Sequence, residues 1–368
     1  MRCARAQNTK PRIPTPDPLT PGPSPRKRGE GRRHLFPAYG IAVIVAFWLA
    51  PAAAQDTAYI AGSGGGQTKI TGRVLDYTGR ELKWEHPGGQ QQSFPAEKVL
   101  QIDTPYGRQQ TDADVLLAKN QFDRALGLYL KAVDGEPRRW VRRQIIARIV
   151  GCYHALDQPQ RAGEAFLLLV RDDPDTPYFD CIPLAWMPRE LPVDLELAAR
   201  QWLGREEPAA QLLGASHLLA GRDRPEALRQ LRRLAAGTDR RIAGLALAQT
   251  WRAETATATP EQLDGWGRLI EQMPGPLAAG PYFVLGSARA QRQQPEQAAL
   301  ALLRVAILYP QQRLLAAQSL VEAGRALEKL DQGQEALRLY REAIHTYPEQ
   351  TRAVAEAQSR LEEIGKNQ

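Results

Sequence analysis

The sequence predicts a mainly α-helical protein in which a small antiparallel β module precedes an α-solenoid of helical hairpins. Three observations lead to this fold class. Residues 69–105 alternate apolar and polar side chains with a period of two, which is typical of strands. From Asp112 onward, apolar residues recur every three or four positions, as in amphipathic helices. Within this helical part, small residues and Pro recur at fixed offsets, which indicates repeated units.

The N-terminal leader, residues 1–33, is rich in Pro and Arg and lacks apolar periodicity, so we expect it to be disordered. It resembles a peptide read through ahead of the true start, which leaves the natural start codon open. Residues 1–54 carry nine Lys or Arg and two acidic residues, whereas the remainder carries 39 of each sign. The net charge of +7 therefore belongs to the leader, and bulk charge gives no support for nucleic-acid binding.

Residues 34–54 match a secretory signal peptide. About a dozen apolar residues follow a basic stretch and end in Ala52-Ala53-Ala54, an A-x-A cleavage site before Gln55. The apolar run is shorter than the ~20 residues that a membrane-spanning helix needs, so membrane attachment would require an uncleaved leader. We expect an exported protein, periplasmic or extracellular.

Residues 55–68 contain the Gly-rich stretch AGSGGGQT and are expected to form a flexible linker. Residues 69–107 are expected to form the β module, with four short strands in an SH3-like or Sm-like half barrel, separated by the turns DYTGR and HPGGQ. A module of about 40 residues should depend on the chain that follows for its stability. Trp84 is expected in its core, although an exposed Trp could bind a sugar polymer.

The clearest repeat lies within residues 279–348. Two copies, 38 residues apart, place small residues at offsets 0 and 12, a bulky residue at offset 16 and Pro at offset 24. The copies are Gly286, Ala298, Leu302, Val305 and Pro310, and then Gly324, Ala336, Tyr340, Ala343 and Pro348. Small residues let two antiparallel helices cross closely, the bulky residue fills the space beneath the crossing, and Pro ends the second helix. Such hairpins must stack to bury their apolar faces.

Less regular copies occupy residues 112–174 and 209–273. Gly151 begins one of them, but its Phe166 lies one position out of register. Ala125, Tyr129, Ala132 and Pro137 supply the second half of another copy, and Gly214 with Ala227 marks a looser one. Residues 175–208, rich in Pro and aromatic residues at their start, are expected to form a packed connector or a binding loop, and residues 351–364 a capping helix.

These repeats resemble tetratricopeptide repeats (TPRs). The opening of that motif is matched by Tyr282-x-x-Leu285-Gly286. The resemblance is strong over residues 281–348, fair over 113–174 and weak over 209–273. Spacings of 37 to 38 residues are similar to those of TPR proteins in bacterial periplasmic assembly and cell division. The resemblance implies a solenoid that binds peptides or partner proteins on its concave face. The chaperone-binding carboxylate clamp of the family is not reproduced.

The sequence favours a protein without catalytic activity, metal or cofactor. Its five His are scattered, and Ser216 lacks the second Gly of a G-x-S-x-G elbow. In an exported protein Cys152 and Cys181 could form a disulfide, or they could be buried thiols that pack as small hydrophobes.

Groove positions follow from the expected repeat. Counted from the small residue of each hairpin, three positions before and one after should face the concave surface. This selects Arg148 and Cys152, Phe283 and Ser287, and Val321 and Arg325. We expect a protein–protein interaction scaffold that binds other envelope proteins or peptides. The alternatives are a self-associating assembly factor, or a polysaccharide-binding protein that uses Trp84 or the loop around Trp186.

Overall fold

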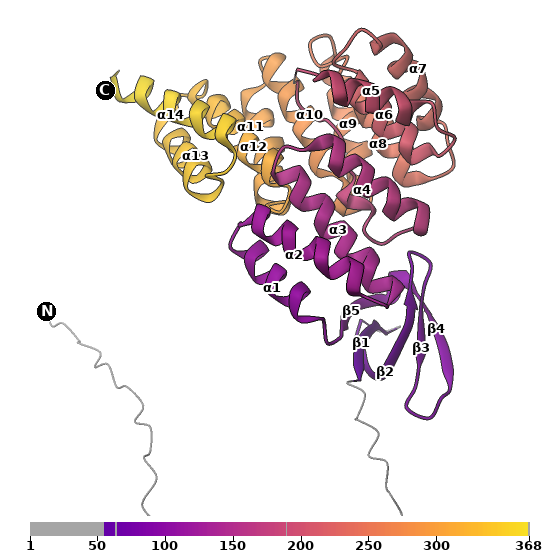
Figure 1. Ribbon diagram of the computed structural model, residues 1–368. Helices are drawn as coiled ribbons and strands as arrows, with labels where there is room; N and C mark the ends of the chain where they lie inside the picture. The colour runs from indigo at the N-terminus through magenta and orange to yellow at the C-terminus, as the bar shows by residue number, and fades with distance from the viewer. Residues whose placement is uncertain (1–54, 63–64, 189, 367–368) are drawn as a thin grey trace, which may run out of the picture. The chain divides into compact units, whose positions relative to one another are not determined.

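The computed structural model describes residues 55–62, 65–188 and 190–366, all within one compact unit, Ala52–Gln368. These residues form fourteen α-helices and one five-stranded antiparallel sheet (Figure 1). The chain is therefore mainly helical with a small β module on its N-terminal side, as predicted. The expected leader, residues 1–33, and signal peptide, residues 34–54, lie outside the described residues.

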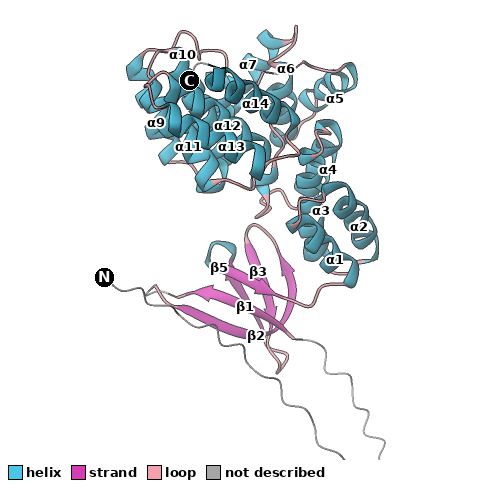
Figure 2. Ribbon diagram, turned by 90° about the vertical axis from the view of Figure 1, so that its left-hand side faces the viewer, coloured by secondary structure: helices cyan, strands magenta, loops and turns pink. Residues whose placement is uncertain are grey.

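The sheet has the strand order β4-β3-β2-β1-β5, and every neighbouring pair is antiparallel. Its strands are β1 (Asp56–Ala61), β2 (Gln67–Tyr77), β3 (Glu81–Glu85), β4 (Gln91–Pro95) and β5 (Val99–Asp103). A short 3₁₀ turn, Ala96–Lys98, joins β4 to β5. Figure 2 shows the sheet beside the first helices of the chain.

Strand β1 corrects the expected linker over residues 55–68. It lies between β2 and β5, with Asp56, Ala58 and Ile60 facing inward. The Asp56 carboxylate accepts hydrogen bonds from the backbone N–H of Val74 at 2.7 Å and from the Thr104 hydroxyl at 2.5 Å. The Gly-rich stretch is the connection between β1 and β2. The module consequently has five strands where four were expected.

Trp84 forms the centre of the small sheet core and is fully buried. Gly72 faces it across β2 and β3, and a Cβ at this position would lie 2.7 Å from Trp84 Nε1. Only Gly fits between the indole and the strand. The structure therefore confirms Trp84 as a core residue, and its alternative role as an exposed sugar-binding aromatic is wrong.

The helices follow the sheet without another strand in the described chain. They are α1 (Arg108–Ala118), α2 (Phe122–Gly135), α3 (Arg139–Ala155), α4 (Pro159–Asp172), α5 (Val193–Leu203), α6 (Pro208–Leu218), α7 (Arg224–Ala235), α8 (Arg240–Trp251), α9 (Pro260–Glu271), α10 (Ala279–Gln291), α11 (Pro295–Leu308), α12 (Arg313–Glu328), α13 (Gly333–Thr346) and α14 (Thr351–Lys366). Helix α14 matches the expected cap. Helix α5 lies within the expected connector, because Leu195, Ala198 and Trp202 supply a buried face at helical spacing.

Four hairpins in the described chain, α1–α2, α3–α4, α10–α11 and α12–α13, are joined by the same turn. Its first residue has a left-handed φ of 52° to 58° and is followed by Gln. The left-handed residues are Asn120, Asp157, Gln293 and Asp331. In each turn the next amide N–H bonds a carbonyl five residues back, which ends the first helix with a Schellman-type closure. This identical turn makes the four hairpins structural repeats.

The small residues of the C-terminal repeats lie where predicted. A Cβ on Gly324 would lie 2.5 Å from the ring of Tyr340, and one on Gly286 would lie 2.6 Å from Leu302 Cγ. In both hairpins the bulky residue at offset 16 packs directly against the small residue at offset 0. The helices can approach this closely only because neither glycine carries a side chain.

Gly151 is not the equivalent residue of the α3–α4 hairpin. It is exposed, and its missing Cβ faces open space in the described structure. The left-handed turn lies seven residues after offset 0 in the C-terminal repeats, and Asp157 then places offset 0 at Val150, which is buried. With this register Phe166 and Pro174 fall at offsets 16 and 24. The predicted phase of this repeat was wrong by one residue.

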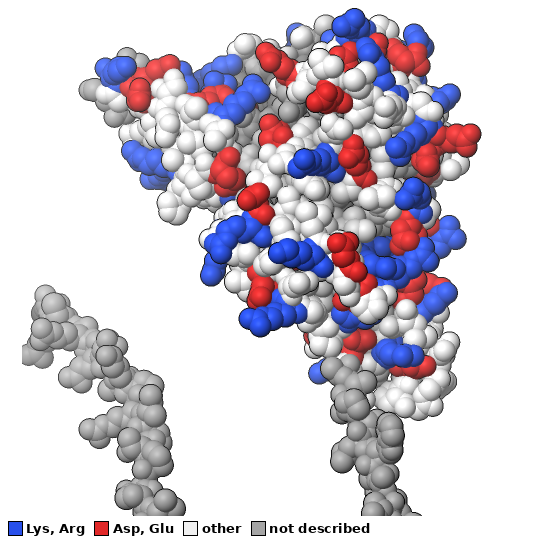
Figure 3. Space-filling model, viewed as in Figure 1, with Lys and Arg blue, Asp and Glu red and all other residues white. Residues whose placement is uncertain are grey.

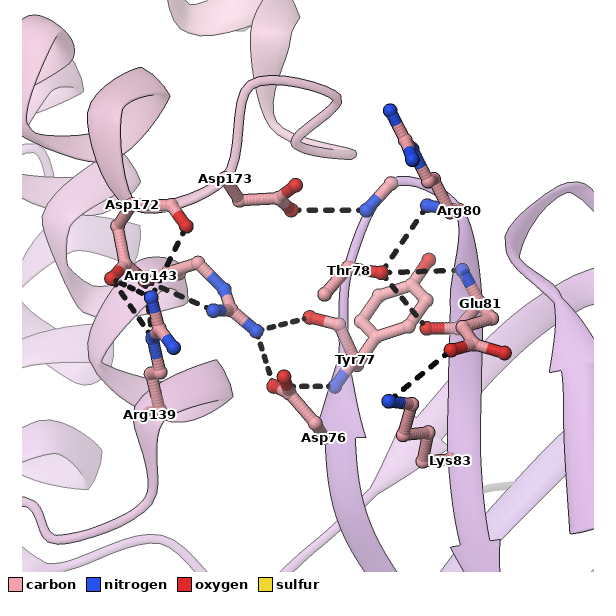
Figure 4. A network of polar contacts seen from close by, with 11 residues as sticks. Asp76, Tyr77, Thr78, Arg80, Glu81, Lys83, Arg139, Arg143, Asp172 and Asp173 are labelled. Carbon is pink, nitrogen blue, oxygen red and sulfur yellow. Dashed lines mark hydrogen bonds and ion pairs between the residues drawn. The ribbon is translucent and has the colours of Figure 1, made fainter.

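Arg143 links the sheet to the first hairpins (Figure 4). Its side chain is 2% exposed and donates to the Tyr77 carbonyl at 2.7 Å, to Asp172 at 2.9 Å and to Asp76. Burial alone would raise the pKa of Asp172, but hydrogen bonds from Arg139 and Arg143 lower it. A guanidinium of α3 thus satisfies acceptors from β2 and α4 at once. This agrees with the expectation that the module depends on the following helices.

Candidate binding groove

A stretch of the chain without helix or strand, residues 182–188, runs against helices α6, α8, α10 and α14. We call it the inner segment. Its backbone at Ala185 donates to the Ser216 hydroxyl at 2.9 Å, and the Ala185 carbonyl accepts from Gln249 at 3.1 Å. His217 Nε2 lies 3.1 Å from the Pro183 carbonyl. Helical side chains thus hold this segment by its main-chain atoms.

Apolar contacts fix the inner segment as well. Leu184 is buried in the core beneath it. Trp186 lies against α10 at Gly280, where a Cβ would be 1.9 Å from the indole. Position 280 therefore admits the Trp186 ring only because it is glycine. At the end of the segment, Arg352 of α14 donates to the Pro188 carbonyl at 3.3 Å.

Three adjoining pockets border the inner segment, and together we call them the inner groove. The arginine pocket, about 290 Å³, is bordered by Arg224, Arg252, Trp186 and Phe283. The middle pocket, about 380 Å³, includes Met187, Ser287, Glu322 and Arg352. The large pocket, about 640 Å³, includes Phe122, Leu156, Leu315 and Arg352. Pro188 borders all three, so the pockets form a row along the segment.

Glu322 of α12 and Arg352 of α14 line the middle pocket of the groove, and an ion pair lies beside Glu322. Arg325 pairs with Glu356 at 2.5 Å and lies 3.7 Å from Glu322. Burial raises the pKa of Glu322, and the charge of Arg325 opposes this effect only in part. The middle pocket therefore offers the Glu322 carboxyl and the Arg352 guanidinium to a bound segment.

The predicted groove residues have different surroundings. Phe283 and Ser287 border both the arginine and the middle pockets, although Phe283 is only 4% exposed. Arg325 is exposed and pairs with Glu356, and it lies outside the lining of the three pockets. Val321 is fully buried and offers no surface to a partner, which corrects its selection. Arg148 is exposed on α3, outside the three pockets.

The correction of the α3–α4 register moves its two predicted groove positions to Ala147 and Gly151. Arg148 and Cys152 were selected one residue too far along the helix. The same error explains why Cys152, selected for the groove, is fully buried.

Cys152 and Cys181 are free thiols, so the disulfide considered between them is not formed. Burial raises the pKa of Cys152 to about 12 and that of Cys181 well above its usual value. Both groups remain protonated at neutral pH. Their thiols are therefore weak nucleophiles and pack as small apolar side chains.

Surface charge, possible metal ligands and helix hydropathy bear on whether the described residues could form other kinds of site. Lys and Arg are mixed with Asp and Glu over the face shown in Figure 3. No cluster of three or more His, Cys, Asp or Glu suited to a metal ion occurs among the described residues. Among the same residues, every helix is too short or too polar to span a bilayer.

The residues that hold the inner segment were not predicted from the sequence. Ser216 and His217 interrupt the apolar run LLGASHLLA, and Gln249 interrupts LALAQTW. All three are buried. A polar residue on the apolar face of a helix usually has a buried partner, so these interruptions were the available signal.

The sequence matches no family model and no curated protein.

Proposed function

We propose that this protein is a non-catalytic scaffold of the cell envelope whose inner groove binds an extended segment of another protein. The observation that carries the proposal is the inner segment itself. Ser216, Gln249 and Arg352 bond the main chain of Ala185 and Pro188, and main-chain bonds of this kind are how proteins hold peptides of varied sequence. The open pockets on either side of Pro188 could accept a second chain alongside.

In this proposal the helical hairpins are TPR-like and stack as a solenoid. The four identical turns and the glycine crossings at Gly286 and Gly324 support the resemblance. Contacts between alternate helices, from α4 through α6, α8, α10 and α12 to α14, support a continuous stack. We also retain an SH3-like or Sm-like half barrel for the sheet, on the strength of its strand order and its 3₁₀ turn before β5.

Export with cleavage after Ala54 is part of the same proposal. Strand β1 begins at Asp56, so cleavage at this site would leave the complete sheet on the mature protein. Asp56 would be the second residue of the mature chain, and its hydrogen bonds to Val74 and Thr104 would hold the new N-terminus in the sheet.

Photo-crosslinking tests the groove directly. A photoreactive amino acid replaces Ser287 in the full chain, and the matched control carries it at Arg229, an exposed position on α7 outside the groove. In envelope extract we expect discrete adducts from position 287 that are absent from position 229. The same adducts from both positions, or none from position 287, would contradict a binding role for the groove.

Self-association is a second candidate, favoured by one surface. Helix α11 exposes Leu300, Ile307 and Leu308 by 60%, 70% and 58%, on one side of the helix. A stripe of this kind is typical of a covered interface. Light scattering of the full chain should show a dimer that the change Ile307→Glu converts to a monomer. A monomer at every concentration would exclude this candidate.

A further inference from the structure

The arginine pocket has a charge that its own walls do not balance. Arg252 donates to the Ser216 carbonyl at 2.8 Å and to the Gln249 side-chain oxygen at 2.7 Å. Both acceptors are neutral. Arg224 borders the same pocket, and within the described residues neither guanidinium has a carboxylate partner. The side chains that border the pocket include neither Asp nor Glu.

The local environment disfavours the charge of Arg252. Burial, together with the nearby positive charge of Arg224, lowers the pKa of Arg252 to about 10. Other arginines with little exposed surface, such as Arg143 and Arg313, have acidic partners. Two guanidinium groups at one pocket without an acid are unfavourable in the free protein, and an entering anion would relieve this repulsion.

Most of the other residues that border the pocket are apolar, and Thr255, Ser287 and Gln291 are its uncharged polar residues. Trp186 and Phe283 form aromatic walls, and Leu219 and Val284 complete them. A fully hydrated inorganic anion gains little from such walls. The volume of about 290 Å³ is at the lower end of the range for small-molecule sites, so the pocket suits one compact group.

We propose that the arginine pocket binds a carboxylate joined to an apolar group. The carboxylate would pair with Arg224 and Arg252, whose planar groups match its two oxygens, and the apolar group would lie between Trp186 and Phe283. A free organic acid or the end of a peptide could supply this chemistry. The arginine pocket is part of the inner groove, but a free acid could bind in it without contacting the other two pockets, so acid binding does not require capture of a partner segment.

Calorimetry of the full chain at low salt tests this proposal with 3-phenylpropionate. We expect millimolar or tighter binding of the acid and at least about tenfold weaker binding of 3-phenylpropionamide, which has the same shape without the charge. Inorganic phosphate should bind more weakly than the acid because it lacks the apolar group. Equal affinity for acid and amide, equal affinity for acid and phosphate, or no acid binding would each overturn the proposal.

Variants locate the binding. Arg224→Gln changes an exposed side chain and should weaken acid binding about tenfold, whereas Arg229→Gln on the same helix should leave it unchanged. Arg252→Lys keeps the positive charge and should retain part of the affinity that Arg252→Gln loses. Far-ultraviolet circular dichroism confirms that each variant is folded. Undiminished binding by both folded glutamine variants would overturn the assignment.

A last comparison identifies the source of the carboxylate. The peptide acetyl-Ala-Ala-Phe is titrated with a free and with an amidated C-terminus. Tighter binding of the free-acid peptide than of 3-phenylpropionate supports a peptide end, and tighter binding of the small acid supports a free organic acid. Crosslinking at position 287 in envelope extract, described above, succeeds or fails independently of these titrations, so the two proposals can fail separately.

Discussion

The glycines of the helical hairpins give a prediction with opposite signs at two sites. Gly324→Ala would place a methyl group 2.5 Å from the Tyr340 ring. The ring is fully buried and its hydroxyl is bonded to Glu328, so it cannot turn away. Overpacking of this kind costs about 1–3 kcal/mol. Alanine recovers about 1 kcal/mol of helix propensity, so we expect a net loss of up to about 2 kcal/mol.

Gly151→Ala is the matched change in α3. Position 151 is exposed, and an added Cβ there meets open space in the described structure. Only the helix-propensity term applies, so this variant should gain about 0.5–1 kcal/mol. Gly286→Ala should lose less than Gly324→Ala, because Leu302 is more flexible than a bonded tyrosine ring.

Urea unfolding followed by circular dichroism measures all three variants. The midpoints should rank Gly151→Ala above wild type, then Gly286→Ala, then Gly324→Ala, with unchanged m-values. Stabilisation by Gly324→Ala, or destabilisation by Gly151→Ala, would refute the assignment of Gly324 to a helix crossing and of Val150 to the equivalent place in α3.

Three further predictions concern charge and thiols. Arg143→Met should lower the free energy of unfolding by about 3 kcal/mol, because a buried cation with several hydrogen bonds is lost. Amide hydrogen exchange should become faster in β2 and β3. Unchanged exchange in these strands would contradict the role of Arg143 in linking the sheet to the helices. Burial opposes ionisation of Glu349, but Arg313 lowers its pKa, so this pair stabilises the fold above about pH 4.3 and less as pH falls. Arg313→Gln should therefore be destabilising at pH 7, and a loss that persists undiminished at low pH contradicts the pair. Cys152, which is fully buried, should resist a thiol reagent at pH 8 until urea unfolds the chain, and rapid native labelling of Cys152 contradicts its burial.

The repeat pattern was readable because its physical causes are local. Small residues at helix crossings and Pro at helix ends recur at fixed spacings within about 25 residues. Gly286 and Gly324 lie at helix crossings, as this spacing predicted. The predicted register of α3–α4 was wrong because the pattern asks for a small residue at offset 0, and Gly151 is small whereas Val150 is not. Counting from the left-handed turn at Asp157 would have corrected it.

The first strand was missed because its inward residues are Asp56, Ala58 and Ile60, a weakly apolar set beside a run of glycines. Its place in the sheet depends on pairing with β5, more than 35 residues away, and on a buried carboxylate that looks like a surface residue in the sequence. Long-range pairing of this kind leaves little local signal.

The candidate groove depends still more on distant contacts. The Pro-rich composition of residues 175–192 correctly excluded a continuous helix there. It could not show that Trp186 would meet Gly280, or that Ser216 and Gln249 would bond Ala185. Arg224 begins α7 and Arg252 follows the end of α8, so their shared pocket appears only when the chain is folded.

The guanidinium of Arg143 has a practical consequence for dissecting this protein. A fragment that starts at residue 108 would retain this buried cation and lose Asp76 and the Tyr77 carbonyl, its partners across the joint. Such a deletion would be unstable for reasons unrelated to whatever the missing strands do. Loss of activity on truncation would then report a folding defect, and point substitutions on the sheet surface are the sounder way to assign its role.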